Sequence, residues 1–258
     1  MSKPKLLCIG HSHLNCVANS IEGRRKHVPG FDDRYDIEVL QLRRDPFHPN
    51  FVQVDGERRI APRCSGALAE SLTQFRPDAI LGMINGQEYQ VISIVNHPVR
   101  YDFPLPGGDE WFDDTAELVP HAVIRAELTR LTQLAVTIFL DELRRLTDCP
   151  LYLVTPPPPI PDENHILAYP GPFAEQAKTF GISPAPFRRK MWRLYRDILR
   201  QEGRKSGAIV LDPPRVSMED DYLAPDYWPK DPIHGNLKYG HAVFDMVTRR
   251  AFPELVKG

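Results

Sequence analysis

A serine, a histidine and an aspartate stand at two places in this 258-residue sequence where they could form a nucleophile and its base. The serine is Ser12, within Gly10-His11-Ser12-His13 and directly after a short apolar run. A hydroxyl at a strand-to-helix turn lies close to a helix N-terminus, whose free N–H groups and positive dipole end favour a developing oxyanion. Such a position suits a nucleophile, although an isolated serine there is more often a helix N-cap.

The histidine and the aspartate lie near the other end of the chain, in Asp231-Pro-Ile-His234. Three-residue spacing across a proline-containing loop lets a carboxylate reach the imidazole Nδ1, which is the orienting contact that a serine–histidine pair requires. Asn85 follows a central apolar run, where its side-chain amide could donate to an oxyanion or simply form a turn with Gly86. These residues can act together only if the fold brings them to one place.

Short apolar runs alternate with helical patterns along the whole chain, as expected when strands are separated by crossover helices. The predicted strands are residues 5–9, 36–42, 78–84, 151–155 and 208–211. The predicted helices are residues 14–26, 66–76, 122–147, 187–202 and 237–251, and a hairpin is predicted at 51–60 around Asp55-Gly56. The pattern predicts a three-layer α/β/α fold, in which helices cover both faces of a five-stranded parallel sheet. Residues that follow the carboxyl ends of the strands should then share one edge of the sheet.

The same motifs, taken in order along the chain, resemble those of the SGNH/GDSL hydrolase superfamily. Its members are serine esterases and acyltransferases built on a five-stranded flavodoxin-like sheet. The most specific match is D-x-x-H, because His234 is followed by Gly235-Asn236, similar to the family's H-x-N continuation. The resemblance implies that Ser12 is the nucleophile, that His234 is the general base and then the general acid, and that Asp231 orients His234.

The resemblance also implies an oxyanion site formed by the N–H groups of Ser12 and Gly66 and by the side chain of Asn85. Three motifs differ from the family pattern. His11 replaces the aspartate of G-D-S, and Asn85 lacks both the glycine two places before it and the aspartate after it. The glycine that often follows H-x-N-x-x comes one place late, as Gly240. The implied catalytic trio is intact, and it requires neither a metal ion nor an organic cofactor.

The activity implied by the resemblance is hydrolysis of an acyl ester, or O-acyl transfer from it, through an acyl-enzyme. Family analogy favours an acetyl ester of a carbohydrate as the substrate, and the trio does not distinguish hydrolysis from transfer. His97, Trp111 and Trp228 stand in predicted loops near the site, where they could line the pocket or pack within the loops. We expect His13 at the pocket mouth, and we expect His11 to brace the turn by hydrogen bonding.

Two other functions are compatible with the motifs. The changes at His11 and around Asn85 would suit a non-catalytic SGNH-like module that binds a glycan or a partner enzyme. His11 and His13 also form an H-x-H pair after the first strand, as in metal-dependent hydrolases. Such a metal site would need several further carboxylate and histidine ligands on later strands.

Composition narrows the class of protein. The chain has 32 lysines and arginines against 34 aspartates and glutamates, which is too little basic charge for a generic nucleic-acid or anionic-membrane binder. Its four cysteines lack C-x-x-C spacing, which favours free thiols in a reducing compartment. No window approaches the roughly 20 apolar residues of a membrane span or the apolar core of a signal peptide. We therefore expect a cytoplasmic protein that acts on a small-molecule or carbohydrate ester.

Proline is the one residue type in marked excess, with 26 in the chain. Most of the prolines fall in three predicted loops, at 96–120, 156–186 and 212–232, and we treat residues 1–258 as one domain that carries these loops. Proline-rich loops lose less entropy when they close around a ligand. The three loops, and above all the run Pro156 to Pro159, are therefore expected to wall the site and to set substrate choice.

Overall fold

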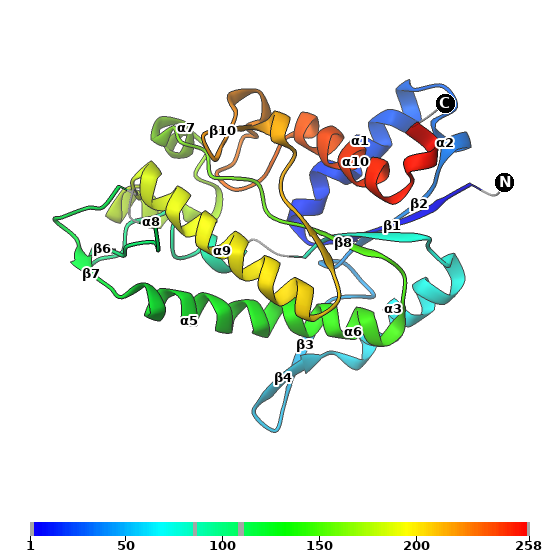
Figure 1. Cartoon of the computed structure of the whole chain (residues 1–258), viewed down its shortest axis with the longest axis horizontal. Coiled ribbons are helices and arrows are strands. Elements are labelled where there is room, and N and C mark those ends of the chain that lie inside the picture. The colour runs from blue at the N-terminus through cyan, green and yellow to red at the C-terminus, as the bar shows by residue number, and fades with distance from the viewer. Residues whose placement is uncertain (1–2, 85–86, 108–110, 257–258) are drawn as a thin grey trace.

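The computed structural model describes residues 3–84, 87–107 and 111–256, and its centre is a five-stranded, all-parallel sheet (Figure 1). The strand order is β2-β1-β5-β8-β9, which is flavodoxin-like. The strands are β1 (Lys5–Gly10), β2 (Asp36–Gln41), β5 (Ala79–Met83), β8 (Leu151–Val154) and β9 (Ile209–Leu211). The fold class predicted from the sequence is confirmed, and each strand begins and ends within one residue of its predicted bounds.

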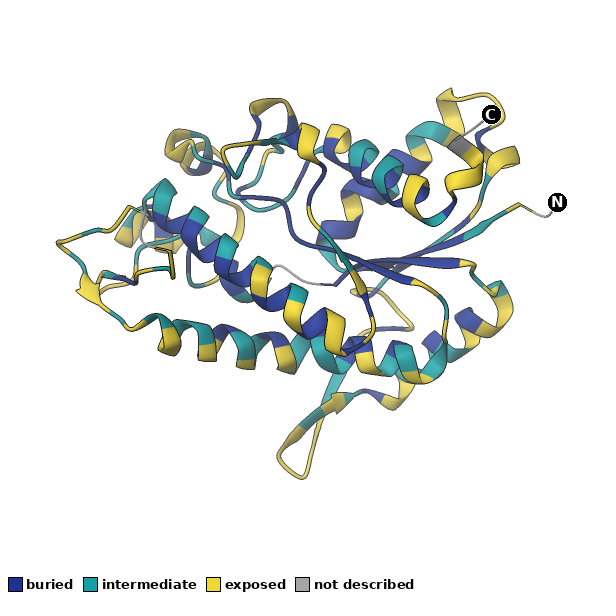
Figure 2. Cartoon of the chain, in the orientation of Figure 1, coloured by how far each residue is buried: buried dark blue, intermediate teal, exposed yellow. Residues whose placement is uncertain are grey.

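Alternate residues of the strands pack into two separate apolar cores, one on each face of the sheet. Leu7 and Ile9 of β1 belong to one core, whereas Leu6 and Cys8 belong to the other. Successive side chains of a strand point to opposite faces, so a strand that is apolar throughout needs cover on both sides. Figure 2 shows these strands buried between helices.

Two groups of helices provide that cover. On one face lie α1 (Asn15–His27) and α10 (Leu237–Ala251), which pack against each other as well as the sheet. The other face is covered by α3 (Pro62–Phe75), α5 (His121–Thr132), α6 (Ile138–Leu146) and α9 (Ala185–Lys205). No helix within the described ranges is both long and apolar enough to cross a membrane.

The helix predicted at 122–147 is confirmed over residues 121–146, but it contains a π-helical turn that the sequence pattern did not predict. Between α5 and α6 the backbone forms a π-helical turn, η2 (Gln133–Thr137). The insertion of a wider turn changes which side chains face the sheet, and such turns are frequent at functional sites. Ala135, within this turn, lines a cleft of about 920 Å³.

Short elements occupy the connections between the main strands and helices. The hairpin predicted at 51–60 is confirmed as β3 (Phe51–Val54) and β4 (Glu57–Ile60), turning at Asp55 and Gly56, which both have positive φ. The remaining short elements are η1 (Ser12–Leu14), α2 (Phe31–Arg34), α4 (Gln87–Gln90), β6 (Tyr101–Asp102), β7 (Glu117–Leu118), α7 (Glu163–Ala168), η3 (Gly171–Phe173), α8 (Ala174–Phe180), η4 (Arg215–Ser217), β10 (Met218–Glu219), β11 (Tyr222–Leu223), η5 (Pro225–Tyr227) and η6 (Pro253–Val256).

The run Pro156 to Pro159 is mostly buried and does not line the cleft of about 920 Å³. Its carbonyls accept hydrogen bonds from Trp192 Nε1 at 3.1 Å to Pro156 and from the Leu223 amide at 3.1 Å to Pro159. Proline has no N–H to satisfy, so a proline run after a central strand can be buried once its carbonyls are bonded. The expectation that this run walls the site is therefore wrong.

The closest approach between α1 and α10 generates a stability prediction. A Cβ built on Gly240 of α10 would lie 2.0 Å from the carbonyl oxygen of Cys16 in α1, whereas a Cβ on Gly23 of α1 would meet nothing within 4 Å. We expect Gly240→Ala to lower the free energy of unfolding by about 2–3 kcal/mol, because the two helix backbones must separate. Gly23→Ala should raise it by about 0.5–1 kcal/mol, since it only improves helix propensity. Urea denaturation of the wild type and the two variants measures these free energies. A free energy of unfolding for Gly240→Ala equal to that of the wild type would contradict the close packing of the two helices.

Candidate active site

Asp231 and His234 form the carboxylate–imidazole contact that their spacing predicts. Asp231 Oδ1 lies 3.0 Å from Nδ1 of His234 and also accepts hydrogen bonds from the amides of Ile233 and His234, each at 2.9 Å. Asn236 then N-caps α10 by accepting a hydrogen bond from the Tyr239 amide at 3.1 Å. The loop is thus closed on Asp231 immediately before the helix begins. Nδ1 of His234 is the donor to this acceptor, which leaves Nε2 as the free base.

The surroundings of Asp231 keep it ionised. Burial acts to raise the pKa of its carboxyl group, but the hydrogen bond and charge interaction with His234 and the amides of Ile233 and His234 outweigh burial. The net result is a pKa below the ordinary value. An ionised Asp231 can stabilise the imidazolium that forms when His234 accepts a proton.

Ser12 is the first residue of η1, which runs directly into α1. Its position is set by the end of β1, because the His11 amide donates to the Met83 carbonyl at 3.1 Å and the Leu14 amide donates to the His11 carbonyl at 3.0 Å. The first N–H groups of a helix have no partner within it, so the Ser12 amide is available for an oxyanion. Gly10 allows this geometry, since a Cβ there would lie 2.4 Å from the Met83 carbonyl oxygen.

Ser12, Asp231 and His234 all line one cleft of about 920 Å³, here called the Ser12 cleft. Within the described residues, Ser12 Oγ makes no hydrogen bond, and Nε2 of His234 is buried without a partner. The structure therefore brings the three predicted residues into one cleft, but it does not join the serine to the histidine. The cleft is lined by His11, Ser12, His13, Arg43, His48, Pro49, Asn50, Phe51, Arg58, Ile84, Glu88, Gln90, Val91, Val95, Ala135, Pro172, Phe173, Gln176, Asp231, Pro232, Ile233 and His234.

His13 packs against His234 instead of standing at the pocket mouth. The two ring centroids are 4.7 Å apart, and only 5% of His13 is exposed. Burial, followed by the charge of His234, lowers the pKa of His13 to about 3. A neutral ring at this place supports the face of His234 without adding a positive charge beside it.

His11 also lines the cleft, on the side of Arg43 and His48. Burial, then the charges of Arg43 and His48, lower its pKa to about 4. Within the described part of the chain its side chain makes no hydrogen bond, so the expected bracing of the turn comes from the His11 backbone. His11 and His13 therefore have different surroundings. No three histidine, cysteine, aspartate or glutamate side chains among the described residues are grouped closely enough to hold a metal ion.

The two other predicted oxyanion donors are not brought to the site. Gly66 is the fifth residue of α3, it is exposed, and it does not line the Ser12 cleft. The amide of a fifth helical residue bonds to the carbonyl four residues earlier, so it is not free to bind an oxyanion. The prediction for Gly66 is corrected on this ground. Asn85 lies outside the described residues.

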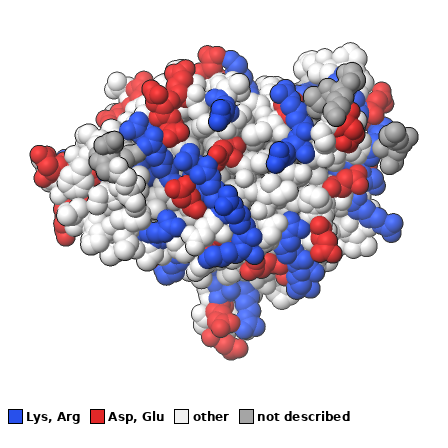
Figure 3. All heavy atoms as spheres, in the orientation of Figure 1, with Lys and Arg blue, Asp and Glu red and all other residues white. Residues whose placement is uncertain are grey.

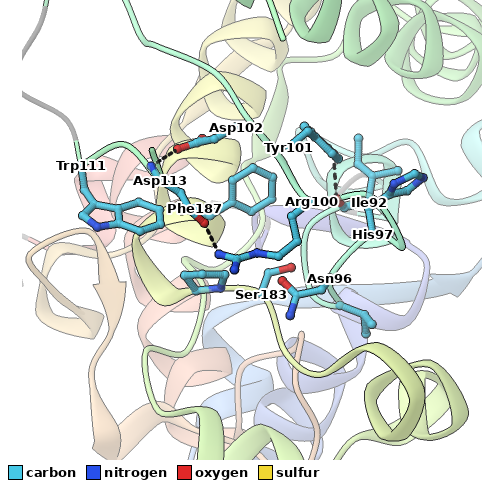
Figure 4. Close-up of a pocket in the computed structure, with 12 residues that line it drawn as sticks. Ile92, Asn96, His97, Arg100, Tyr101, Asp102, Trp111, Asp113, Ser183 and Phe187 are labelled. Atoms are coloured by element: carbon cyan, nitrogen blue, oxygen red, sulfur yellow. Dashed lines mark hydrogen bonds and ion pairs between the residues drawn. The ribbon is translucent and has the colours of Figure 1, made fainter. Parts of the chain in front are cut away.

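His97, Trp111 and Trp228 do not line the Ser12 cleft. His97 and Trp111 line a separate cavity of about 20 Å³, together with Phe187 (Figure 4). Trp228 donates from Nε1 to the Leu223 carbonyl at 2.6 Å and packs against the ring of His165. Trp228 therefore packs within its loop, which was the alternative left open by the sequence.

Several residues of the cleft were missed by sequence reasoning. Arg43 and His48 follow β2, Arg58 comes from β4, and Gln90 comes from α4. The signal for Arg43 was its place just after a strand, where the sheet edge forms. The hairpin residue Arg58 carries no such signal, since only the folding of β4 toward the cleft places it there.

No family model matches the sequence, and no curated protein matches it. Among solved structures, the periplasmic domain of the lipopolysaccharide acetyltransferase of Salmonella ser. Paratyphi A is similar with a TM-score of 0.49, 11% identity and coverage of 96% of this chain and 84% of that chain. A GDSL-like lipase from Bacteroides thetaiotaomicron has a TM-score of 0.45, 10% identity and coverage of 99% and 93%. A carbohydrate acetylesterase from Sinorhizobium meliloti has a TM-score of 0.40, 14% identity and coverage of 96% and 100%. With TM-scores below 0.5, function must be inferred from this chain's own residues.

The burial of His13 leads to a prediction about acid stability. The pKa of His13 is about 3 in the folded protein against an ordinary 6.5. Between these two pH values the unfolded chain therefore binds a proton that the folded chain does not. The free energy of unfolding should therefore fall as pH is lowered from 6.5 toward 3, by up to about 1.4 kcal/mol per pH unit for this residue. His13→Gln should show a smaller fall, and His27→Gln, at an exposed position, should follow the wild type. Urea denaturation at pH 7 and pH 4.5 measures how far the free energy of unfolding falls in each protein. A fall in His13→Gln as large as that in the wild type would contradict the prediction.

Proposed function

We propose that the protein is an SGNH-type serine ester hydrolase or O-acyltransferase that acts through Ser12, His234 and Asp231. The observation that carries the proposal is the Asp231–His234 pair. Its carboxylate is fixed by three contacts of 2.9 to 3.0 Å, in the same cleft as a serine at a helix N-terminus. This arrangement supplies a nucleophile, an oriented base and an amide donor in one cleft.

In the proposed reaction, Ser12 Oγ attacks the acyl carbonyl carbon while its proton passes to Nε2 of His234. The negative charge on the carbonyl oxygen is stabilised by the Ser12 amide at the start of η1. The bond to the alcohol oxygen then breaks, and His234 returns the proton to that oxygen, leaving an acyl-enzyme. Water or an acceptor hydroxyl then gives a proton to His234 and attacks the acyl carbon. As the bond from that carbon to Ser12 Oγ breaks, His234 returns the proton to Ser12 Oγ, which restores the free serine.

The reaction requires Ser12 Oγ to approach Nε2 of His234, a contact that the structure does not contain. Catalytic hydrogen bonds are often long or misaligned before substrate binds and tighten in the complex. Nε2 is buried and unpartnered among the described residues, so a hydrogen bond from Ser12 would satisfy it. The geometry is compatible with a site that closes on its substrate.

A non-catalytic SGNH-like module that binds a glycan or a partner enzyme is the second candidate. It is favoured by two observations: Ser12 and His234 are not joined, and Gly66 lies within a helix away from the cleft. The cleft of about 920 Å³ would accommodate a sugar in either case. Labelling of Ser12 by a fluorophosphonate probe distinguishes the candidates, since only an activated serine reacts.

The catalytic assignment is tested with p-nitrophenyl acetate. We expect Ser12→Ala and His234→Ala each to lower kcat by roughly a thousandfold or more, and their combination to cost little beyond either change alone. Asp231→Asn should lower kcat less, because it removes orientation but leaves the base. Ser71→Ala, on α3 outside the cleft, is the matched control. Equal rates for the wild type and Ser12→Ala would exclude Ser12 as the nucleophile.

A further inference from the structure

Two arginines line the Ser12 cleft, one just after β2 and one in β4. β1 and β2 pair with Gly10 opposite Gln41, and the Leu42 amide donates to the Gly10 carbonyl at 2.9 Å. Ser12 and Arg43 therefore stand at equivalent positions, two residues beyond the last pair of neighbouring strands. Arg58 reaches the same cleft from β4. Ser12, Arg43 and Arg58 thus all line one cleft.

Neither arginine has an acidic partner. Within the described part of the chain, no carboxylate lies within 4.0 Å of either guanidinium group, and neither group hydrogen-bonds to the protein. The Arg58 guanidinium carbon lies 4.1 Å from the centre of the Phe51 ring, so stacking holds this side chain in place. A guanidinium group that is already held loses less entropy when it binds a ligand.

The basic residues of α9 differ from this pair. Arg193 lies 2.7 Å from Asp221, and Arg200 lies 2.5 Å from Asp212. Figure 3 shows blue and red side chains interspersed on the face that includes this helix. Those cations are balanced by neighbours, as expected for a solvated surface, whereas the cations of the cleft are not.

The acidic residues of the cleft are engaged elsewhere. Asp231 is bound to His234, and Glu88 accepts a hydrogen bond from the Tyr195 hydroxyl. The low pKa of His11, about 4, arises from burial and then from the charges of Arg43 and His48, which is independent support for a positive field beside Ser12. That field would attract an anion to the Ser12 cleft.

We propose that Arg43 and Arg58 bind a phosphate group of the substrate, so that the ester attacked by Ser12 is a phosphate-bearing one. Two guanidinium forks present paired N–H donors that match phosphate oxygens, and no acid in the described structure competes for them. This inference rests on the proposed function, because it names the substrate class of the same site.

The first experiment compares two acetyl esters that differ in charge, 4-acetoxyphenyl phosphate and 4-methoxyphenyl acetate. We expect the ratio of their kcat/KM values to favour the phosphate ester in the wild type and to fall by about ten- to a hundredfold in Arg43→Gln/Arg58→Gln. Arg44→Gln and Arg59→Gln are matched controls, because these neighbours do not line the cleft and Arg59 pairs with Glu57 at 2.8 Å. A ratio that is the same in the double variant and the controls would overturn the proposal.

The second experiment separates the phosphate site from the catalytic assignment. Titration of inorganic phosphate into Ser12→Ala, followed by calorimetry, needs no turnover. Binding should weaken by about ten- to a hundredfold when Arg43→Gln/Arg58→Gln is added to Ser12→Ala, and it should weaken as salt is raised. Phosphate binding in the absence of any esterase activity would overturn the proposed function but leave the phosphate site standing. Equal phosphate binding with and without the two arginines, or no phosphate binding to either protein, would overturn the phosphate site but leave the proposed function standing.

Discussion

The pairing of β1 between β2 and β5 determines where chemistry can occur in this protein. Gly10 ends the strand against the Met83 carbonyl so closely that no side chain would fit, and the chain then turns into η1 and α1. Ser12, Arg43 and Ile84 consequently follow three adjacent strands and line one cleft. Parallel strands bring their carboxyl ends to the same edge, so a change that separated β1 from β5 would displace the whole site.

The other half of the site depends on local structure at the far end of the chain. One oxygen of Asp231 accepts hydrogen bonds from two amides and from the imidazole of His234, all within four consecutive residues. Asn236 then N-caps α10. Because α10 packs against α1, which follows Ser12, this loop and Ser12 line the same cleft. The distance between nucleophile and base is therefore set by helix packing, while the geometry within the Asp231–His234 pair is set by the loop itself.

The residues that line the Ser12 cleft include both neutral and positively charged groups. Burial keeps His13 neutral, with a pKa of about 3, where it contacts His234. Arg43 and Arg58 line the same cleft and are unpartnered among the described residues. A neutral ring in contact with the base and two unpaired guanidinium groups in the lining provide for proton transfer and anion binding in one cleft.

The sequence by itself determined the sheet, the order of its elements and the Asp231–His234 contact, because each depends on short-range pattern: continuous apolar runs, helical periodicity and a three-residue loop spacing. The sequence also indicated Ser12 as a candidate nucleophile, because Ser12 stands at a predicted strand-to-helix turn. Tertiary structure alone decided the rest. The burial of Pro156 to Pro159 depends on partners distant in sequence, Trp192 and Leu223. The sequence pattern also missed the π-helical turn at η2 and the start of α3 before Gly66. The packing of His13 against His234 and the place of Arg58 in the cleft follow from how the layers pack, and they leave no local pattern in the sequence.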